Sequence, residues 1–346
     1  MNQLRYLSLF SAICLATPLL AQGEVDLRTT AKKGSSVWLV QETKQAQVID
    51  MQGQEMETEQ STTRTLCFTV KDVDDKGNLV VETKIARIQG STKLPMGMGD
   101  MEFDSAAPAS DEDDDGGMGG MGGMMKKAMM AGAGKSFTAK LSPLGKVIEL
   151  MDGAADILKS DDEKMPGGEA MSADTLKQLV ESAFGTLPEK ATAVGAKWQH
   201  TQKEGNARMP AESKLEMTLT KADAESFEIT AVGTVDKPAE AKADTKDGEK
   251  IDDGDEQEAM GREMLKSMKM KNGKQTGTLK VSRQDGFVLE STNTVTMDVE
   301  MSAGQMGDMQ MSMKQTVTCK RTTAEAAVPA KKAEAPKDEP KKDAGK

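Results

Sequence analysis

The sequence contains few aromatic residues and a single histidine. One Tyr, two Trp and seven Phe occur among 346 residues, and the one histidine is His200. A Ser-His-Asp or Cys-His catalytic site would depend on His200 alone, and neither a nucleophile elbow nor a histidine-based metal motif is present. We therefore expect a protein that is not an enzyme and that has no catalytic residue and no cofactor. A hydrolase-type carboxylate site stays open as an alternative, because 56 acidic residues make close pairs inevitable.

Charge and hydropathy argue against two further classes of protein, nucleic-acid-binding proteins and integral membrane proteins. The formal net charge is −11, which is unfavourable for nucleic-acid binding. The apolar run from Tyr6 to Leu20 is too short to favour a membrane span, and it lies between Arg5 and the small residue Ala21. These features are typical of a secretory signal peptide. We predict cleavage near Ala21 and an extracytoplasmic protein, periplasmic or secreted, that is not an integral membrane protein.

Cysteine is scarce, and two cysteines remain after the predicted cleavage. Cys67 and Cys319 both lie in predicted strands, in a compartment where disulfides persist. Side-chain alternation is an objection to a bridge, because Cys67 shares a strand face with Thr65 and Thr69, whereas Cys319 shares one with Val317. A Cys67–Cys319 disulfide stays open.

Methionine is abundant, with 27 residues, and supplies much of the bulky apolar volume. Thioethers are soft ligands that suit Cu(I). A glycine tract therefore contains four candidate metal ligands, which are Met118, Met121, Met124 and Met125. The alternative is that these methionines only pack.

The same succession of features occurs twice along the chain. Gly34 and Gly195 each precede a predicted strand that contains tryptophan. An alternating hairpin, an excursion rich in acid and methionine, and a Gly-Lys pair follow in each half. The strands after the excursions match best, with residues 140–149 corresponding to residues 280–290. This pattern predicts an internal repeat of an antiparallel β unit.

Composition divides the chain into segments of different character. The main segments are a signal peptide (1–21), a first β repeat (22–150), a helical connection (151–190), a second β repeat (191–322) and a disordered tail rich in Lys, Ala, Pro and Glu (323–346). The first repeat contains an acidic, Gly/Met-rich low-complexity excursion at about 105–133, and the second a charged disordered loop at about 236–256. The clearest helix begins after Ser172 and ends before Gly185, and a weaker one covers residues 154–159. A long hairpin with alternating Met and Val spans residues 295–319.

We therefore predict a mainly β (α+β) fold. Two similar antiparallel β units form a curved sheet or half-barrel, with a central helical segment and disordered excursions.

Several short motifs resemble a known family. They are Phe103-Asp104-Ser105, Gly134-Lys135-Ser136-Phe137 before Leu141-Ser142-Pro143-Leu144-Gly145, and Leu187-Pro188 before Val194-Gly195 and Trp198. Together they resemble DUF6263, an uncharacterised domain family of exported bacterial proteins, over most of residues 24–321. The resemblance implies a secreted β-rich domain and supplies no catalytic residue.

The Met/Lys segments favour one specific function. Met124, Met125 and Met129 share one face of a short amphipathic helix, and Met260, Met264 and Met268 share a face of another. We expect such helices to cover a concave apolar sheet face that binds an apolar small molecule or an envelope component. The alternative is that these helices only complete the core. The expected role is binding or structural, at the cell envelope. The alternatives are a Met-rich copper-binding protein and the carboxylate hydrolase.

Overall fold

The computed structural model describes residues 23–93, 100–107, 118–159, 172–205, 210–237, 267–302 and 308–324. The predicted signal peptide lies outside these residues, as do nearly all of the charged loop at 236–256 and of the tail at 323–346.

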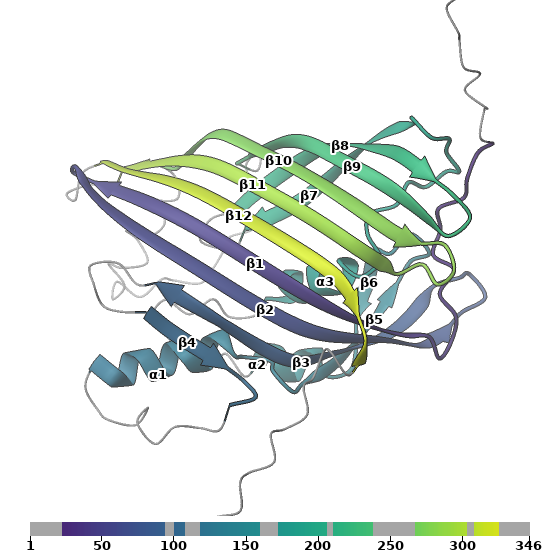
Figure 1. Ribbon diagram of the computed structural model, residues 1–346, viewed down its shortest axis with the longest axis horizontal. Helices are drawn as coiled ribbons and strands as arrows, with labels where there is room; N and C mark the ends of the chain where they lie inside the picture. The colour runs from purple at the N-terminus through teal and green to yellow at the C-terminus, as the bar shows by residue number, and fades with distance from the viewer. Residues whose placement is uncertain are drawn as a thin grey trace, which may run out of the picture.

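The described residues form one open antiparallel sheet of twelve strands, which curves around a small helical layer (Figure 1). The strands of the first half are β1 (Ser36–Met51), β2 (Gln54–Val73), β3 (Leu79–Lys93), β4 (Asp100–Asp104), β5 (Ser136–Leu141) and β6 (Val147–Leu150). Those of the second half are β7 (Lys197–Gly205), β8 (Pro210–Ala222), β9 (Ser226–Asp236), β10 (Lys269–Ser282), β11 (Val288–Ser302) and β12 (Asp308–Thr322). The helices are α1 (Met118–Met129), α2 (Ala154–Lys159) and α3 (Ala173–Glu181). The predicted mainly β, curved-sheet fold is confirmed.

The two halves follow the same strand order within the sheet. The first half runs β6-β5-β3-β2-β1, and the second half runs β11-β10-β9-β8-β7. Strand β12 lies between β1 and β11. Strand β4 pairs with β3 outside this order. Both halves also start alike, because the N–H groups of Gly34 and Gly195, at φ 85° and 89°, donate to the carbonyls of Val70 and Leu219. A positive φ costs glycine little, which accounts for its use at both positions. The common order agrees with the predicted repeat, and the duplication itself stays a prediction.

The two faces of the sheet differ because side chains alternate along each strand. The convex face carries cross-strand ion pairs, including Lys320–Glu290 at 3.0 Å and Lys280–Glu228 at 3.3 Å. The concave face carries the buried side chains and packs against α3. The interior of the protein therefore lies within the curve of the sheet.

Helix α3 forms where the sequence predicts it. The Ser172 hydroxyl caps its first turn by accepting a hydrogen bond from the Thr175 N–H at 3.1 Å. Leu176 and Val180, four residues apart on one face, are fully buried. The chain then turns at Gly185, where a Cβ atom would lie 2.4 Å from the Leu279 side chain. That close approach fixes the helix end against β10.

The apolar interior consists of three clusters. The first joins α2 and α3 to the strands of the first half, and the second lies mainly on β8 and β9. The third, here called the methionine cluster, is formed by Ala211, Val235, Met268, Val295, Met297, Val299 and Met311, with Ile49, Met270, Met301 and Met313 packed against it. The alternating Met and Val residues of the predicted 295–319 hairpin thus contribute to a buried face.

Part of the first excursion is helical. Helix α1 begins at Met118, ends at Met129 and lies beside β4 (Figure 1), and it contains Met124, Met125 and Met129, for which the sequence predicts a short amphipathic helix. Met129 packs against the first core cluster, which gives this glycine-rich helix a buried anchor. In the second predicted helix, Met268 immediately precedes β10 and is 2% exposed in the methionine cluster, whereas Met260 and Met264 lie outside the described residues.

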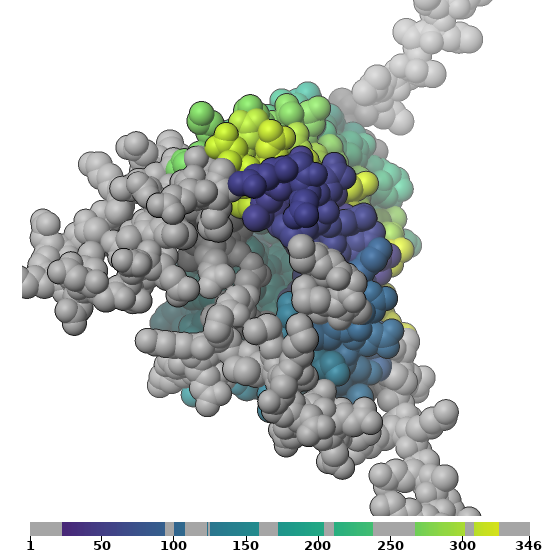
Figure 2. All heavy atoms as spheres, turned by 90° about the vertical axis from the view of Figure 1, so that its left-hand side faces the viewer, coloured from purple at the N-terminus to yellow at the C-terminus, as the bar shows by residue number. Residues whose placement is uncertain are grey.

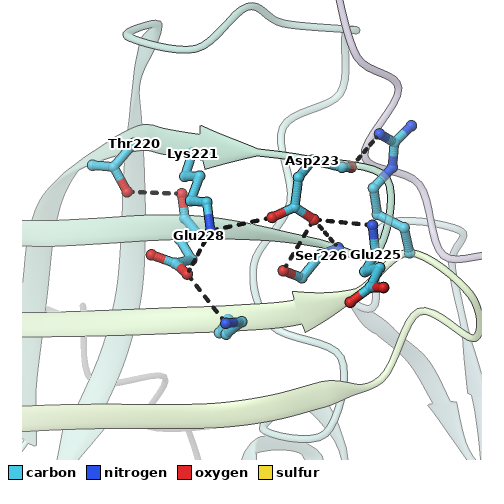
Figure 3. Close-up of polar contacts among 8 residues, drawn as sticks. Thr220, Lys221, Asp223, Glu225, Ser226 and Glu228 are labelled. Carbon is cyan, nitrogen blue, oxygen red and sulfur yellow. Dashed lines mark hydrogen bonds and ion pairs between the residues drawn. The ribbon is translucent and has the colours of Figure 1, made fainter.

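An aspartate closes the turn between β8 and β9 (Figure 3). The Asp223 carboxylate accepts hydrogen bonds from the N–H groups of Ser226 at 2.8 Å and Glu225 at 2.9 Å. These bonds, followed by that of Lys221, lower the pKa of Asp223 to about 2. Its backbone carbonyl accepts from the Arg283 guanidinium at 2.8 Å. The turn is thereby tied to the end of β10.

Candidate functional site

A cavity of about 520 Å³ lies on the concave face, between the sheet and α3. Strands β1, β2 and β7 to β12 contribute to its lining. Seen from the end where β1 turns into β2, the molecule has a hollow below β1, with teal residues of the middle of the chain behind it (Figure 2). Sites for small molecules commonly enclose about 300–1,000 Å³, so the cavity has the size of a ligand site.

The lining divides into two chemically different walls. The polar wall comes from β1 and β2 and consists of Gln41, Thr43, Gln45, Gln60, Thr62 and Arg64. The apolar wall comes from β8 and β9 and consists of Ala211, Leu215, Met217, Ile229 and Ala231. Strands β10 to β12, between these walls, contribute side chains of both kinds. The expectation of an apolar concave face is therefore correct for one side of the cavity and wrong for the other.

Strand register builds the polar wall. Gln45 lies directly opposite Gln60 on β2 and opposite Gln315 on β12. Alternation places Gln41 and Thr43 on the same face of β1. Leu39, two residues before Gln41, is fully buried on that face, so β1 changes from apolar to polar where it passes from the core to the cavity. The sequence analysis missed these residues, although the pattern Gln-x-Thr-x-Gln was visible.

Several amides of the lining hydrogen bond to neighbouring side chains. The three donor–acceptor pairs are Gln315 Nε2 to Gln45 Oε1 at 3.4 Å, Gln60 Nε2 to Thr62 Oγ1 at 3.4 Å, and Gln275 Nε2 to Asn293 Oδ1 at 3.1 Å. The first and third pairs join neighbouring strands, whereas Gln60 and Thr62 both lie on β2.

Gln41 differs from these amides. The residue is 9% exposed, it lines the cavity, and its amide atoms are not among the fully buried side-chain atoms without a partner in the described part of the chain. It lies between Arg64 on β2 and Cys319 on β12 in the strand register. The polar wall therefore contains an amide, on a largely buried residue, whose donors and acceptor are open to the cavity.

Two titratable groups lie at the α3 end of the cavity, and burial favours the neutral form of both. Burial raises the pKa of Glu181, although its Oε1 accepts a hydrogen bond from the Val147 N–H at 2.8 Å. Burial, followed by the charge of Lys146, lowers the pKa of His200. Among the described lining residues, only Arg64 and Glu181 carry formal charges at neutral pH, and these are of opposite sign. The formal charges of the described lining residues therefore sum to zero, with the positive one on β2 and the negative one on α3.

The disulfide left open by the sequence is not formed. Cys67 and Cys319 are both free. Cys319 lies opposite Gln41 on the concave face and lines the cavity, whereas Cys67 lies opposite Trp38 on the other face of β1. Alternation thus places the sheet between the two thiols. Burial raises the pKa of the Cys319 thiol to about 12.

The four candidate metal ligands lie on α1, away from the cavity lining. The side chain of Met125 is 36% exposed, and those of Met118, Met121 and Met124 lie outside the described atoms. Within the described ranges there is no group of three or more His, Cys, Asp or Glu side chains that could hold a metal ion. Methionine coordination by α1 stays a prediction.

Within the same ranges, no helix has the length and apolar character needed to cross a membrane.

Residues 76–288 match a family described as a family of unknown function, DUF6263. No curated protein sequence matches the chain significantly.

The solved structures that the chain matches share little sequence with it. A lipovitellin structure concerned with lipid–protein interactions is 7% identical, with a TM-score of 0.40, over 84% of this chain and 25% of the other. An outer-membrane channel from Pseudomonas putida F1 is 8% identical, with a TM-score of 0.23, over 86% of this chain and 100% of the other. A domain of a lipoprotein-sorting protein from Vibrio parahaemolyticus is 8% identical, with a TM-score of 0.13, over 82% and 86% of the two chains. The chain thus spans about a quarter of the lipovitellin chain that it matches.

Proposed function

Because the chain belongs to DUF6263, a family of unknown function, its activity has to be argued from its own geometry, and we propose that it binds a small apolar ligand in the cavity on the concave face. The observation that carries this proposal is the apolar wall inside a cavity of about 520 Å³. The proposed role is binding without catalysis, outside the cytoplasm.

The apolar wall is suited to a hydrocarbon group. Leu215, Met217 and Ile229 are at most 5% exposed, so packing behind them holds the wall in place. Each methylene group moved from water onto such a surface contributes about 0.8 kcal/mol. A ligand with several methylene groups would therefore gain enough free energy for specific binding.

The rest of the lining supports binding rather than catalysis. The polar wall consists mainly of amides and hydroxyls, which orient a ligand by hydrogen bonding without exchanging protons at neutral pH. Glu181 and His200 are held toward their neutral forms at the α3 end.

The proposed location rests on the pattern of residues 1–21, which is typical of a secretory signal peptide. Fractionation of the native cells, followed by mass measurement of the purified protein, tests it. An envelope fraction that contains a chain beginning near Gln22 is expected, and a cytoplasmic chain that retains residues 1–21 would contradict the location.

Binding is tested with a neutral apolar dye, N-phenyl-1-naphthylamine, whose fluorescence rises in apolar surroundings. Ala231→Phe places a ring in the cavity from the apolar wall. The matched control is Val232→Phe on the convex face of the same strand, where Val232 is 61% exposed. If the ring displaces the equivalent of two methylene contacts, the dye affinity falls about tenfold.

We expect Ala231→Phe to weaken dye binding and Val232→Phe to leave it unchanged, with thermal unfolding confirming that both variants fold. Equal dye affinities for the two variants would place the dye outside the cavity. A wild-type protein that binds no dye would contradict the proposed function.

A further inference from the structure

We infer that the ligand is an amphiphile with an uncharged, hydroxyl-bearing or amide-bearing head, which lies with its head on the polar wall and its hydrocarbon part on the apolar wall. This inference rests on the proposed function and adds the chemical class and the orientation of the ligand.

The separation of the two walls supports an amphiphile. In the sheet order, β1 and β9 are four strand spacings apart, or roughly 19 Å along the sheet at about 4.8 Å per spacing. All cavity-lining residues of β1 and β2 are polar, and all those of β8 and β9 are apolar. A pure hydrocarbon would remove water from the amides and hydroxyls without replacing their hydrogen bonds, which is unfavourable. A ligand that is polar at one end and apolar at the other matches both walls.

The kind of polar group on the wall favours an uncharged head. An amide offers two N–H donors and an acceptor oxygen, and a threonine hydroxyl both donates and accepts. A ligand hydroxyl or amide also donates and accepts, so it can satisfy both sides of each group. A carboxylate only accepts and would leave the Gln41 amide oxygen without a donor. Arg64, opposite Gln41 on β2, is the one formally positive residue among the described lining residues, so the comparison with an anionic head is part of the test.

Gln41 identifies where the head lies. Gln41 is 9% exposed and lines the cavity, and its amide atoms are not among the fully buried side-chain atoms of the described residues, so they are accessible from the cavity. A ligand hydroxyl at this position would form hydrogen bonds without breaking any that the protein makes. Gln45, two residues along β1, presents a second amide to the same side of the cavity. The head therefore lies at Gln41, beside β1 and β2.

The apolar wall then accommodates the chain of the amphiphile. Val295 and Met297 on β11 and Met313 on β12 add apolar side chains to the cavity lining. The first two belong to the methionine cluster, and Met313 packs against it. Methionine side chains adapt their shape to what they contact, so this surface can fit a flexible chain.

The test is displacement of N-phenyl-1-naphthylamine by three amphiphiles that share one chain length, each below its critical micelle concentration. Monolauroylglycerol and lauryl glucoside carry uncharged hydroxyl heads, and laurate carries a carboxylate. We expect the uncharged amphiphiles to displace the dye at about tenfold lower concentration than laurate, which corresponds to one or two additional hydrogen bonds. The relative affinities of the first two distinguish a glycerol head from a sugar head.

Variants locate the head. Gln41→Met keeps the length of the side chain and removes its amide, so we expect about tenfold weaker binding of the better uncharged amphiphile, with dye affinity changed less than about twofold. The control is Gln47→Met on the same strand. The Gln47 amide donates to the Met311 sulfur at 3.0 Å, and Gln47 does not line the cavity, so its replacement should leave amphiphile binding unchanged.

Tighter binding of laurate than of the uncharged amphiphiles would overturn the inference and assign an anionic head. Unchanged binding of the uncharged amphiphile to a folded Gln41→Met variant would also overturn it, because the head would then lie elsewhere. Neither result contradicts the proposed function, which fails only if the wild-type protein does not bind the dye in the cavity.

Discussion

Replacing Gln41 by methionine should make the ligand-free protein more stable. In the wild-type protein Gln41 is 9% exposed, and its amide faces the cavity. Removing an unpartnered buried amide recovers about 1–3 kcal/mol in general. Because the Gln41 amide atoms are not fully buried and water in the cavity can reach them, the lower end of this range applies. We expect a gain of about 1 kcal/mol in the free energy of unfolding, or about 2–4 °C in Tm for a protein of this size.

The assay is urea unfolding of delipidated protein, followed by the fluorescence of Trp38 and Trp198. Gln47→Met is the matched control, because the Gln47 amide has a hydrogen-bond acceptor, the Met311 sulfur, and the substitution removes this bond. The free energy of unfolding of this variant should therefore equal that of the wild type or be lower. A Gln41→Met variant less stable than the wild type by more than about 0.5 kcal/mol would refute the reasoning, since the amide would then be making a favourable interaction. A stabilised variant with weaker amphiphile binding would show that stability is given up at this position for function.

Four further results are expected. The lone histidine, His200, should titrate in an NMR experiment with a pKa below the usual value of about 6.5. Because protonation of His200 then favours the unfolded chain, the stability that the neutral imidazole contributes is lost as the pH falls through this region. An unshifted pKa would contradict the burial of His200. Glu181→Gln should stabilise the protein at neutral pH in urea unfolding, because the raised pKa of Glu181 makes its ionised form unfavourable in the folded state, and the difference should vanish in acid, where Glu181 is protonated. In a chain without residues 1–21, a thiol reagent at pH about 8 should modify Cys67 in the folded protein, while Cys319 reacts only after unfolding. Replacing six methionines by leucine should leave dye and amphiphile binding intact and abolish any Cu(I) binding measured by titration. Equal Cu(I) binding by the wild type and this variant would exclude the six residues as ligands. They are Met118, Met121, Met124, Met125, Met129 and Met130.

Local patterns in the sequence were sufficient to predict several strands and the central helix. Alternating Val and Met residues predicted the hairpin of β11 and β12, and helical spacing after Ser172 predicted α3. Glycines before β1 and β7 indicated similar starts of the two halves. These features depend on residues close in the chain, whose periodicity and turn chemistry are visible directly.

The cavity could not be read from the same patterns. Along β1, Gln41, Thr43 and Gln45 alternate with residues that are also mostly polar, so alternation gives no indication of which face is concave. In the structure the glutamines face inward, while Val48 on the opposite face is 36% exposed. The pairing of β1 with both β2 and β12 decided this orientation, and β12 lies more than 250 residues away in the chain.

The sequence by itself therefore determined the strand-rich composition, the central helix and the similar order of elements in both halves, because each of these follows from local spacing of apolar and turn residues. The tertiary structure alone decided that β12 joins the halves, that the two cysteines lie on opposite faces, and that a polar wall faces an apolar wall across one cavity. The physical reason is strand register: a shift of one residue exchanges every side chain between the two faces, and register is set by partners distant in the sequence.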